Sequence, residues 1–368
     1  MATFPIDAAL REQGRAAVSW LAGPAGRPIV AAAALGLGGL IAFTLYEAVA
    51  LGLPVAREEP ARFDLYHAGR SAFALLVSGL LVAALVRARA RPSPLDIESC
   101  RASSMTLAGL ALAAGCAATA LFVVDPAAFH AHAQEDRPLE WASAGLLAAA
   151  GALFAFAALR QFLAKARRNW PGLVLGGGLA AVLLVMAMEE ISWGQRLFGF
   201  ATPETLAEMN WQGEFNFHNI QTDLSELVYY AGAAVFLGLL PLLRDLVPPA
   251  AAARPLFAFV PRRGVALVGA PLVWFNYGHW NLLPVQLATM LALFALLAFA
   301  RAAARRGDKA EQALFLLAAA AAVGGQALFL AFGPAMTELP DATEYKEFFI
   351  ALGFAWYALS ATRRPARG

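Results

Sequence analysis

Two adjacent glutamates and two separate histidines hold the acid–base chemistry that this sequence offers. Glu189 and Glu190 close an apolar run in the stretch MAMEEISWGQR, and the later segments FNFHN and FNYGHWN each bring one histidine. Two carboxylates and two imidazoles can bind one divalent cation such as zinc, or can provide a general base beside an oxyanion site. We therefore predict one candidate site, catalytic or metal-binding, with four members: Glu189, Glu190, His218 and His279.

Polar side chains near these four residues extend the candidate site. We expect four of them to support it: Gln195, Arg196, Asn219 and Asn281. A structural alternative stays open for the glutamates, which can cap a helix at the membrane surface. In that alternative Glu189 pairs with Arg196, because positions 189, 193 and 196 share one face of a continuing helix. A single histidine at a membrane surface is also more often an anchor than a ligand.

The composition indicates which elements must position these residues. Hydrophobic residues make up 60% of the 368 positions and charged residues only 15%, whereas a soluble domain carries about 25% charged residues. Apolar runs of about 20 residues recur along the whole chain, which is typical of an all-α polytopic membrane protein. The basic residues are dispersed, so the sequence offers no nucleic-acid-binding patch. Its two cysteines provide neither a disulfide framework nor a metal-binding spacing.

About ten segments are apolar enough to cross a bilayer as helices. They are 28–53, 71–87, 104–124, 141–162, 171–191, 224–243, 264–280, 284–301, 311–332 and 345–361. The seventh and eighth are barely long enough, and Pro284 at their junction leaves a hairpin or a re-entrant pair open. After the fifth segment, Thr202-Pro203-Glu204 predicts the start of a short interfacial helix at about 203–210.

Lysine and arginine alternate between the two sides of this arrangement. One set of connections carries 22 of the 28 basic residues and the other set carries six. The positive-inside rule therefore places both termini in the cytoplasm. We predict a cytoplasmic segment 1–26 with an amphipathic surface helix within 5–21, a single transmembrane domain 27–362, and a basic tail 363–368.

Acidic residues and histidines gather on the opposite, outer side. It holds 19 of the 26 aspartates and glutamates and all five histidines, although acidic residues contribute little to orientation. The longest outer connection, 192–223, contains six Trp and Phe residues and runs from the glutamate pair to just beyond His218. Because consecutive helices are usually neighbours, its two ends should meet in one polar site at the membrane surface.

One stretch carries a resemblance. EEISWGQRLFGFATPETLAEMNWQGEFNFHN resembles a signature of a group of uncharacterised bacterial polytopic membrane proteins, over about thirty residues. This resemblance brings no chemistry with it, and it implies the bacterial cytoplasmic (inner) membrane.

A weaker likeness is to CAAX-processing-type intramembrane proteases, which have a Glu pair followed by Arg, then Phe-x-x-x-His, then a His with Asn or Asp four residues on. It implies that Glu189 is the water-activating base and that Phe275 and His279 form the second motif. The sequence departs from this pattern at Gly194, where an arginine is expected, and the third motif is absent. A third likeness, to lipid-linked glycosyltransferases, implies a role for Asp64 in the first outer connection, although the large outer domain of those enzymes is absent.

Two classes of function fit these observations. In the first, the protein is a hydrolase or transferase that acts on a lipid, a lipid-linked molecule or a membrane-bound peptide, which enters sideways from the membrane. In the second, it is a transporter or a lipid-binding scaffold without catalysis. Transporters typically show charged residues at mid-span and internal repeats. Here Gln326 is the polar residue that stands out at mid-span, and no repeat is clear, which disfavours ion coupling.

Overall fold

The chain folds as a bundle of helices, as its composition predicts. The computed structural model describes residues 27–53, 64–89, 91–134, 136–163, 170–210, 212–252, 255–275, 280, 282–336 and 342–363. Every regular element within these residues is a helix, and eight of the helices are long and apolar enough to cross a membrane. The predicted all-α polytopic fold is thus confirmed. The predicted surface helix at 5–21 and most of the basic tail lie outside the described residues.

The helices fall into a long set and a short set. The long ones are α2 (Arg27–Ala50), α3 (Leu65–Ala88), α5 (Ala102–Val124), α7 (Pro138–Leu163), α8 (Trp170–Glu190), α11 (Thr222–Ala233) continuing through the π-helix η4 (Ala234–Leu239) into α12 (Leu240–Leu246), α15 (Leu283–Arg306), α16 (Lys309–Met336) and α17 (Thr343–Thr362). The short ones are α4 (Pro94–Ile97), α6 (Pro126–His132), η2 (Ser192–Gly194), α9 (Gln195–Phe198), α10 (Glu204–Met209), η3 (His218–Ile220), α13 (Pro249–Ala252), η5 (Pro255–Phe259), α14 (Arg263–Val268) and η6 (Ala270–Val273). The short helix α10 confirms the helix predicted at about 203–210.

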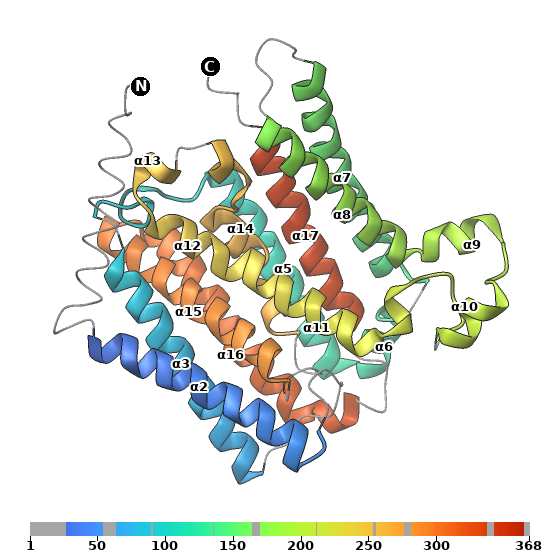
Figure 1. Cartoon of the computed structure of the whole chain (residues 1–368), viewed down its shortest axis with the longest axis horizontal. Coiled ribbons are helices and arrows are strands. Elements are labelled where there is room, and N and C mark those ends of the chain that lie inside the picture. Colours follow the sequence, from blue (N-terminus) through green and yellow to red (C-terminus); the bar gives the residue numbers. More distant parts are fainter. Residues whose placement is uncertain are drawn as a thin grey trace.

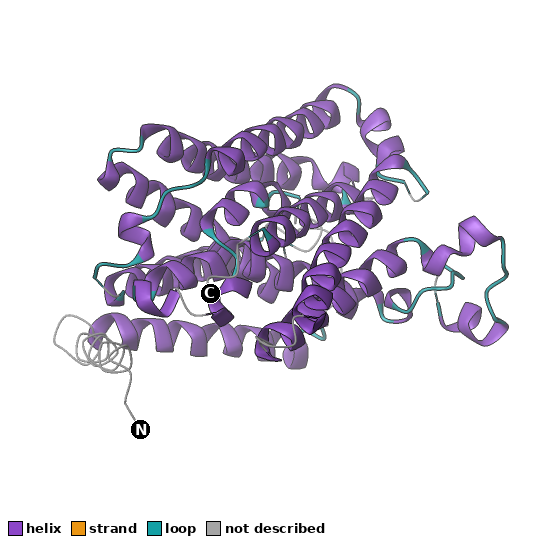
Figure 2. Cartoon of the chain, turned by 90° about the horizontal axis from the view of Figure 1, so that it is seen from above, coloured by secondary structure: helices purple, strands orange, loops and turns teal. Residues whose placement is uncertain are grey.

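The long helices pack side by side in a defined order. α8 packs on α7, α7 on α17, and α17 on the short α14 and η6 at the centre of the bundle. On the other side of that centre lie α5, α16 and α15, followed by α3 and then α2 at the edge. The segment with α9 and α10 projects away from the bundle beyond the end of α8 (Figures 1 and 2). This projecting segment is the long outer connection that the sequence predicts between the fifth and sixth crossings.

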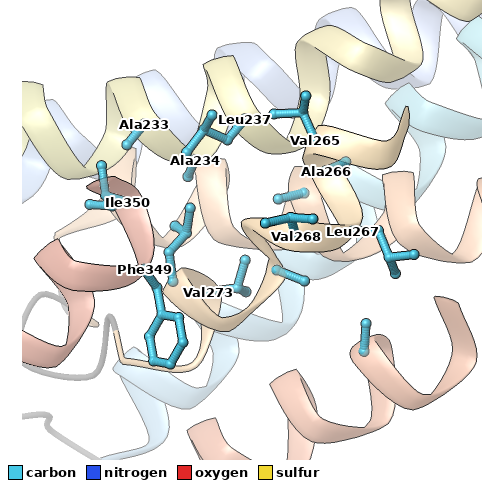
Figure 3. Packing of buried hydrophobic residues seen from close by; sticks show 14 of the residues in the cluster. Ala233, Ala234, Leu237, Val265, Ala266, Leu267, Val268, Val273, Phe349 and Ile350 are labelled. Atoms are coloured by element: carbon cyan, nitrogen blue, oxygen red, sulfur yellow. The ribbon is translucent and has the colours of Figure 1, made fainter. Parts of the chain in front are cut away.

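The seventh predicted crossing is not a continuous helix, so the prediction of one helix over 264–280 is wrong. The chain forms the single short helix α14, turns at Gly269, continues as the 3-10 helix η6 and ends in a turn at Trp274 and Phe275. Pro271 explains the break, because a proline has no N–H to donate and collides with the preceding helical turn. Such irregular backbone is tolerated at membrane depth only where protein surrounds it. In Figure 3, Val265 to Val268 and Val273 lie beside η4 and α17, and the side chains from Val265 to Val273 are buried.

Polar and small residues of the surrounding helices accommodate this broken segment. The side-chain amide of Gln326 in α16 donates to the carbonyl oxygen of Val273 at 2.6 Å, which satisfies a backbone group that no helix bonds. Trp274 fits between Gly115 of α5 and Gly325 of α16, where a Cβ atom would lie 2.2 and 2.8 Å from its ring. Gln326, the polar residue that stood out at mid-span, therefore has a structural role.

Ion pairs identify one end of the bundle, which we call the basic face. Arg263 donates from Nε to Asp245 Oδ2 at 2.8 Å, which joins the start of α14 to the end of α12. Arg306 Nη2 lies 2.9 Å from Glu311 Oε1, which joins the end of α15 to the start of α16. Because α14 begins at this face and α15 ends there, the broken segment must carry the chain to the opposite end before α15 returns. The predicted alternation of the crossings is therefore preserved.

The opposite end, which we call the acidic face, joins α8, α11 and α17. Tyr230 of α11 donates to Glu347 of α17 at 2.8 Å, and Glu189 of α8 bonds to residues that precede α11. α17 has 20 residues, about 30 Å at 1.5 Å per residue, so it is long enough to cross. Its first two turns hold Glu344, Lys346 and Glu347, which lower its hydropathy. Three charges at the start of this helix thus belong to the acidic face.

Candidate functional site

A left-handed turn separates the end of α8 from the projecting segment. Ser192, Trp193 and Gly194 have φ values of 46°, 54° and 79°, which is the left-handed region. Residues other than glycine enter this region at a cost, and such strain concentrates at sites that the surrounding structure holds firmly. The turn is held by Ser192, whose buried hydroxyl donates to Glu214 Oε2 at 2.5 Å. It directs Trp193 back toward the helix that it has just left.

Glu189 joins the two ends of the connection between α8 and α11. Its Oε1 accepts from the indole Nε1 of Trp193 at 2.6 Å. Its Oε2 accepts from the backbone N–H groups of Phe217 and His218 at 2.8 and 2.9 Å. The same oxygen lies 3.2 Å from Nδ1 of His218. Both oxygens of this carboxylate are therefore occupied, so Glu189 acts as an acceptor that positions its neighbours.

His218 is the group that this arrangement leaves available. Its Nδ1 faces Glu189, and its side chain is 40% exposed, so Nε2 is free to meet a reactant. Partial burial works to lower the pKa of His218, but the hydrogen bond to Glu189 and the negative charge of Glu347 outweigh it, so the pKa lies above the usual 6.5. A carboxylate on one ring nitrogen fixes the tautomer and orientation of a histidine that acts through the other.

Glu190 turns the opposite way and faces the interior of the bundle. Its carboxyl group lies within hydrogen-bonding reach of Glu347 of α17. A hydrogen bond between two carboxyl groups requires a proton on one of them, because two neighbouring carboxylates cannot both be ionised without a large repulsion. Tyr230 donates its hydroxyl proton to Oε1 of Glu347 at 2.8 Å. The two carboxyl groups can therefore share and exchange one proton.

Further polar groups surround this carboxyl pair. Lys346 is buried, and its Nζ lies 3.3 Å from the centre of the Tyr230 ring, which is a cation–π contact. The hydroxyl of Tyr229 is buried and has no hydrogen-bond partner among the described residues. Glu344 and Glu226 complete the cluster. Glu344 interacts electrostatically with Glu190, and Glu226 interacts electrostatically with Glu347. These residues come from α11 and α17, so the site lies between three helices.

The predicted supporting residues hold the projecting segment together. Arg196 pairs with Asp136 at 3.1 Å and also with Glu214, so the alternative in which it pairs with Glu189 is wrong. Gln195 accepts from the N–H of Phe215 at 2.8 Å and donates to Thr202. Asn219 donates to Gln212. Gln195, Arg196 and Asn219 of the stretch 189–219 therefore stabilise the fold of the projecting segment.

Of the four predicted site residues, the structure brings together three. Glu189 contacts His218, and Glu190 and His218 both interact with Glu347. His279 and the supporting residue Asn281 lie outside the described residues. Within the described part of the chain, no three His, Cys, Asp or Glu side chains are arranged to hold a metal ion. The predicted divalent metal, such as zinc, stays a prediction, because one of its four predicted ligands is not described.

The sequence carried a signal for the residues of α17 that the prediction missed. Glu344, Lys346 and Glu347 open the last apolar run as EYKEFF. They are the second, fourth and fifth residues of α17, and charges within a crossing helix are expensive unless they face the interior of the bundle. A histidine or carboxylate elsewhere should therefore have been sought as their partner. The tyrosine pair at 229–230 gave a weaker signal.

The surroundings of Asp64 differ from those of the main site. Asp64 caps α3 by accepting from the N–H of His67 at 2.8 Å, and it also bonds to the His67 ring.

Compared with protein-family models, curated proteins and solved structures, the chain matches none of them. The resemblances to intramembrane proteases and to glycosyltransferases therefore stay predictions.

Proposed function

We propose that this integral membrane protein is a hydrolase or transferase that performs acid–base chemistry at the acidic face. The observation that carries the proposal is the juxtaposition of a carboxylate-oriented histidine, His218, with a proton-sharing carboxyl pair, Glu190 and Glu347. Acid–base catalysis needs one group that takes a proton and another that returns it. Three helices supply both kinds of group within one cluster.

Each group has a distinct role in this proposal. His218 Nε2 takes a proton from water or from an acceptor hydroxyl group as it attacks the substrate, while Glu189 holds the ring and stabilises the imidazolium that forms. The Glu190–Glu347 pair gives its shared proton to the leaving group, and the His218 imidazolium, which interacts with Glu347, restores that proton to the pair. Tyr230, which donates to Glu347, stabilises the negative charge of the pair. In this proposal Glu189 is a positioning residue, and the histidine takes the place of Glu189 as the base.

The projecting segment supports a substrate that comes from the membrane. Its side chains Leu197, Phe198, Met209 and Phe217 are all more than half exposed. Apolar and aromatic side chains of this kind settle at the level of the lipid headgroups. They all precede the histidine along the chain, and Phe217 is its direct neighbour, so a lipid, a lipid-linked molecule or a membrane-bound peptide would reach His218 by sideways diffusion.

A product assay tests this function. The purified protein is placed in vesicles of bacterial inner-membrane lipid extract, and mass spectrometry follows the species released or modified over time. Replacement His218→Gln removes the base and should slow product formation by roughly 10²–10⁴-fold. The control is His132→Gln, because His132 ends α6 and bonds to the Ala128 carbonyl oxygen of the same helix. Product formation that is absent in the native protein, or unchanged in His218→Gln, would refute the proposal.

A second candidate function, proton or cation binding without catalysis, is favoured by the burial of Glu344 and Lys346. Buried ionisable groups in membrane helices commonly mark ion pathways. Proton uptake by the native protein in sealed vesicles, lost in Glu347→Gln and kept in His218→Gln, would select this candidate over the enzyme.

A further inference from the structure

A separate cavity of about 70 Å³ lies at the basic face, away from the acid–base site. It opens between the start of α5, the start of α14 and the end of α17. Its charged and hydroxyl-bearing lining includes Glu98, Arg101, Ser103, Arg262, Arg263 and Arg363. Four arginines against one glutamate give this cavity a positive field.

One arginine of the lining is already neutralised and forms a rigid wall. Arg263 is buried and donates to Asp245 at 2.8 Å and to the carbonyl oxygen of Pro94 at 2.6 Å. Glu98, the acidic residue of the lining, lies 3.3 Å from Arg244. These contacts fix the wall of the cavity before any ligand arrives. The negative charge of Glu98 is paired with Arg244.

The other three arginines have no carboxylate partner within the described part of the chain: Arg101, Arg262 and Arg363. The Nε–H of Arg262 is buried without an acceptor. Burial, and after it the positive charge of Arg244, lower the pKa of Arg262. Desolvated positive charge of this kind is stabilised when an anion binds beside it.

The start of α5 adds neutral donors to the same cavity. Arg101 is the N-cap residue of this 23-residue helix, whose first N–H groups have no partner within the helix and favour an anion. Ser103 and Ser104 in its first turn both line the cavity. Ser104 Oγ accepts from Nε1 of Trp356 at 3.2 Å, so its hydroxyl proton remains available to a ligand.

We propose that this cavity binds one phosphate-type oxyanion, held by Arg101, Arg262 and Arg363. A cavity of about 70 Å³ has room for a tetrahedral oxyanion between these arginines. The oxyanion comes either from the headgroup of an anionic phospholipid or from a soluble phosphate compound, because both present the same oxygens to the arginines. The proposal does not depend on the acid–base site at the other face.

Two binding measurements on the full-length protein test the proposal. Native mass spectrometry measures how much phosphatidylglycerol stays bound relative to phosphatidylcholine. The thermal midpoint in detergent is measured with added inorganic phosphate at constant ionic strength. The pocket variant is Arg262→Gln with Arg363→Gln, and the control is Arg87→Gln with Arg301→Gln, two exposed arginines of the same face outside the cavity.

We expect the affinity of the pocket variant for its ligand to fall by about tenfold or more, because two charge-assisted hydrogen bonds are removed. The affinity of the control variant should not change. Loss of phosphatidylglycerol alone identifies a lipid headgroup, and loss of the phosphate-induced rise in midpoint alone identifies a soluble phosphate compound. The midpoint without added anion should be the same in both variants, which shows that the pocket variant folds. Equal binding in the pocket variant and the control, or no preference for either anion in the native protein, overturns the proposal.

Discussion

Two neighbouring residues, Glu189 and Glu190, have opposite tasks because they point in different directions. Successive side chains on a helix are rotated by about 100°, so the last turn of α8 presents one carboxylate to the connection that follows it and the next to the bundle. Glu189 meets backbone N–H groups and a histidine, whereas Glu190 meets another carboxyl group. The chemistry of each glutamate is set by what it faces.

The contact between Glu189 and His218 predicts a pH-dependent contribution to stability. The pKa of His218 is raised in the folded protein above its unfolded value of 6.5. The stabilisation is therefore complete below about pH 6.5 and is lost as the pH rises through the raised pKa. The difference in thermal midpoint between the native protein and His218→Gln should be largest at mildly acidic pH and should shrink toward alkaline pH. A difference that stays constant with pH would contradict this coupling.

The left-handed turn predicts that Gly194 cannot be replaced without cost. An alanine at φ +79° costs about 1–2 kcal/mol, and its Cβ would lie 3.0 Å from the Phe198 ring. In Gly194→Ala the backbone N–H groups of Phe217 and His218 should exchange with deuterium roughly 5–30 times faster, as that energy implies. The control is Gly178→Ala, which lies in α8 with open space around it. Unchanged exchange in Gly194→Ala would mean that the turn does not hold the loop.

Sequence reasoning reached part of the site because part of it is local. Glu189 and His218 lie near the two ends of one connection. Consecutive helices are usually neighbours, so their proximity could be predicted, and the two side chains are in contact. Glu347 follows Glu190 by more than 150 positions, and its approach depends on how α17 packs against α7. No spacing rule encodes that packing. The role of Glu189 as a base stays a prediction, and its four hydrogen bonds come from backbone and side chains whose directions the strained turn sets.

At the scale of elements, the broken seventh segment organises the bundle. It has too few helical residues to cross alone, yet Val265, Leu267 and Val268 are among the most buried side chains. The surrounding long helices present small residues toward it, which lets Trp274 approach their backbones. The centre of this protein is therefore an irregular chain enclosed by regular helices.

This enclosure predicts an effect of adding one methyl group. In Gly115→Ala the new Cβ would lie 2.2 Å from the Trp274 ring, which is also confined by Gly325. Overpacking of this kind typically costs 1–3 kcal/mol, so the denaturant midpoint of the purified protein should fall. Gly109→Ala in the same helix meets nothing within 4 Å and should not lower it. Equal midpoints for the two variants would contradict the confined position of Trp274.

Hydropathy predicted the regular crossings well because a bilayer imposes length and apolarity on a helix that faces lipid. It failed at the seventh crossing, where the same apolar composition serves burial inside protein. The sequence contained the reason for the break in Gly269 and Pro271. The apolar composition of the run predicts a helix, whereas these two residues favour a break in it.

At the scale of the whole molecule, charge is segregated between the two ends of the bundle. The acidic face holds Glu190, Glu344 and Glu347, and the basic face holds Arg262, Arg263 and Arg306. The two faces therefore suit different ligands: a reactant that needs proton transfer at one, and an oxyanion at the other. Their separation by the length of the helices means that a variant at one face should leave the other unaffected.

This segregation predicts the orientation of the protein in its membrane. Basic connections remain in the cytoplasm, so the acidic face and the projecting segment should lie outside. In a background of Cys100→Ser with Cys116→Ala, the variant Glu208→Cys marks the projecting segment and Lys309→Cys marks the basic face, and both positions are exposed. A membrane-impermeant maleimide should label Glu208→Cys in cells whose inner membrane is intact, and Lys309→Cys only after the membrane is opened. The reverse pattern would place the acid–base site in the cytoplasm. Labelling of both variants before opening would show that the two faces share one side, which the alternation of crossings forbids.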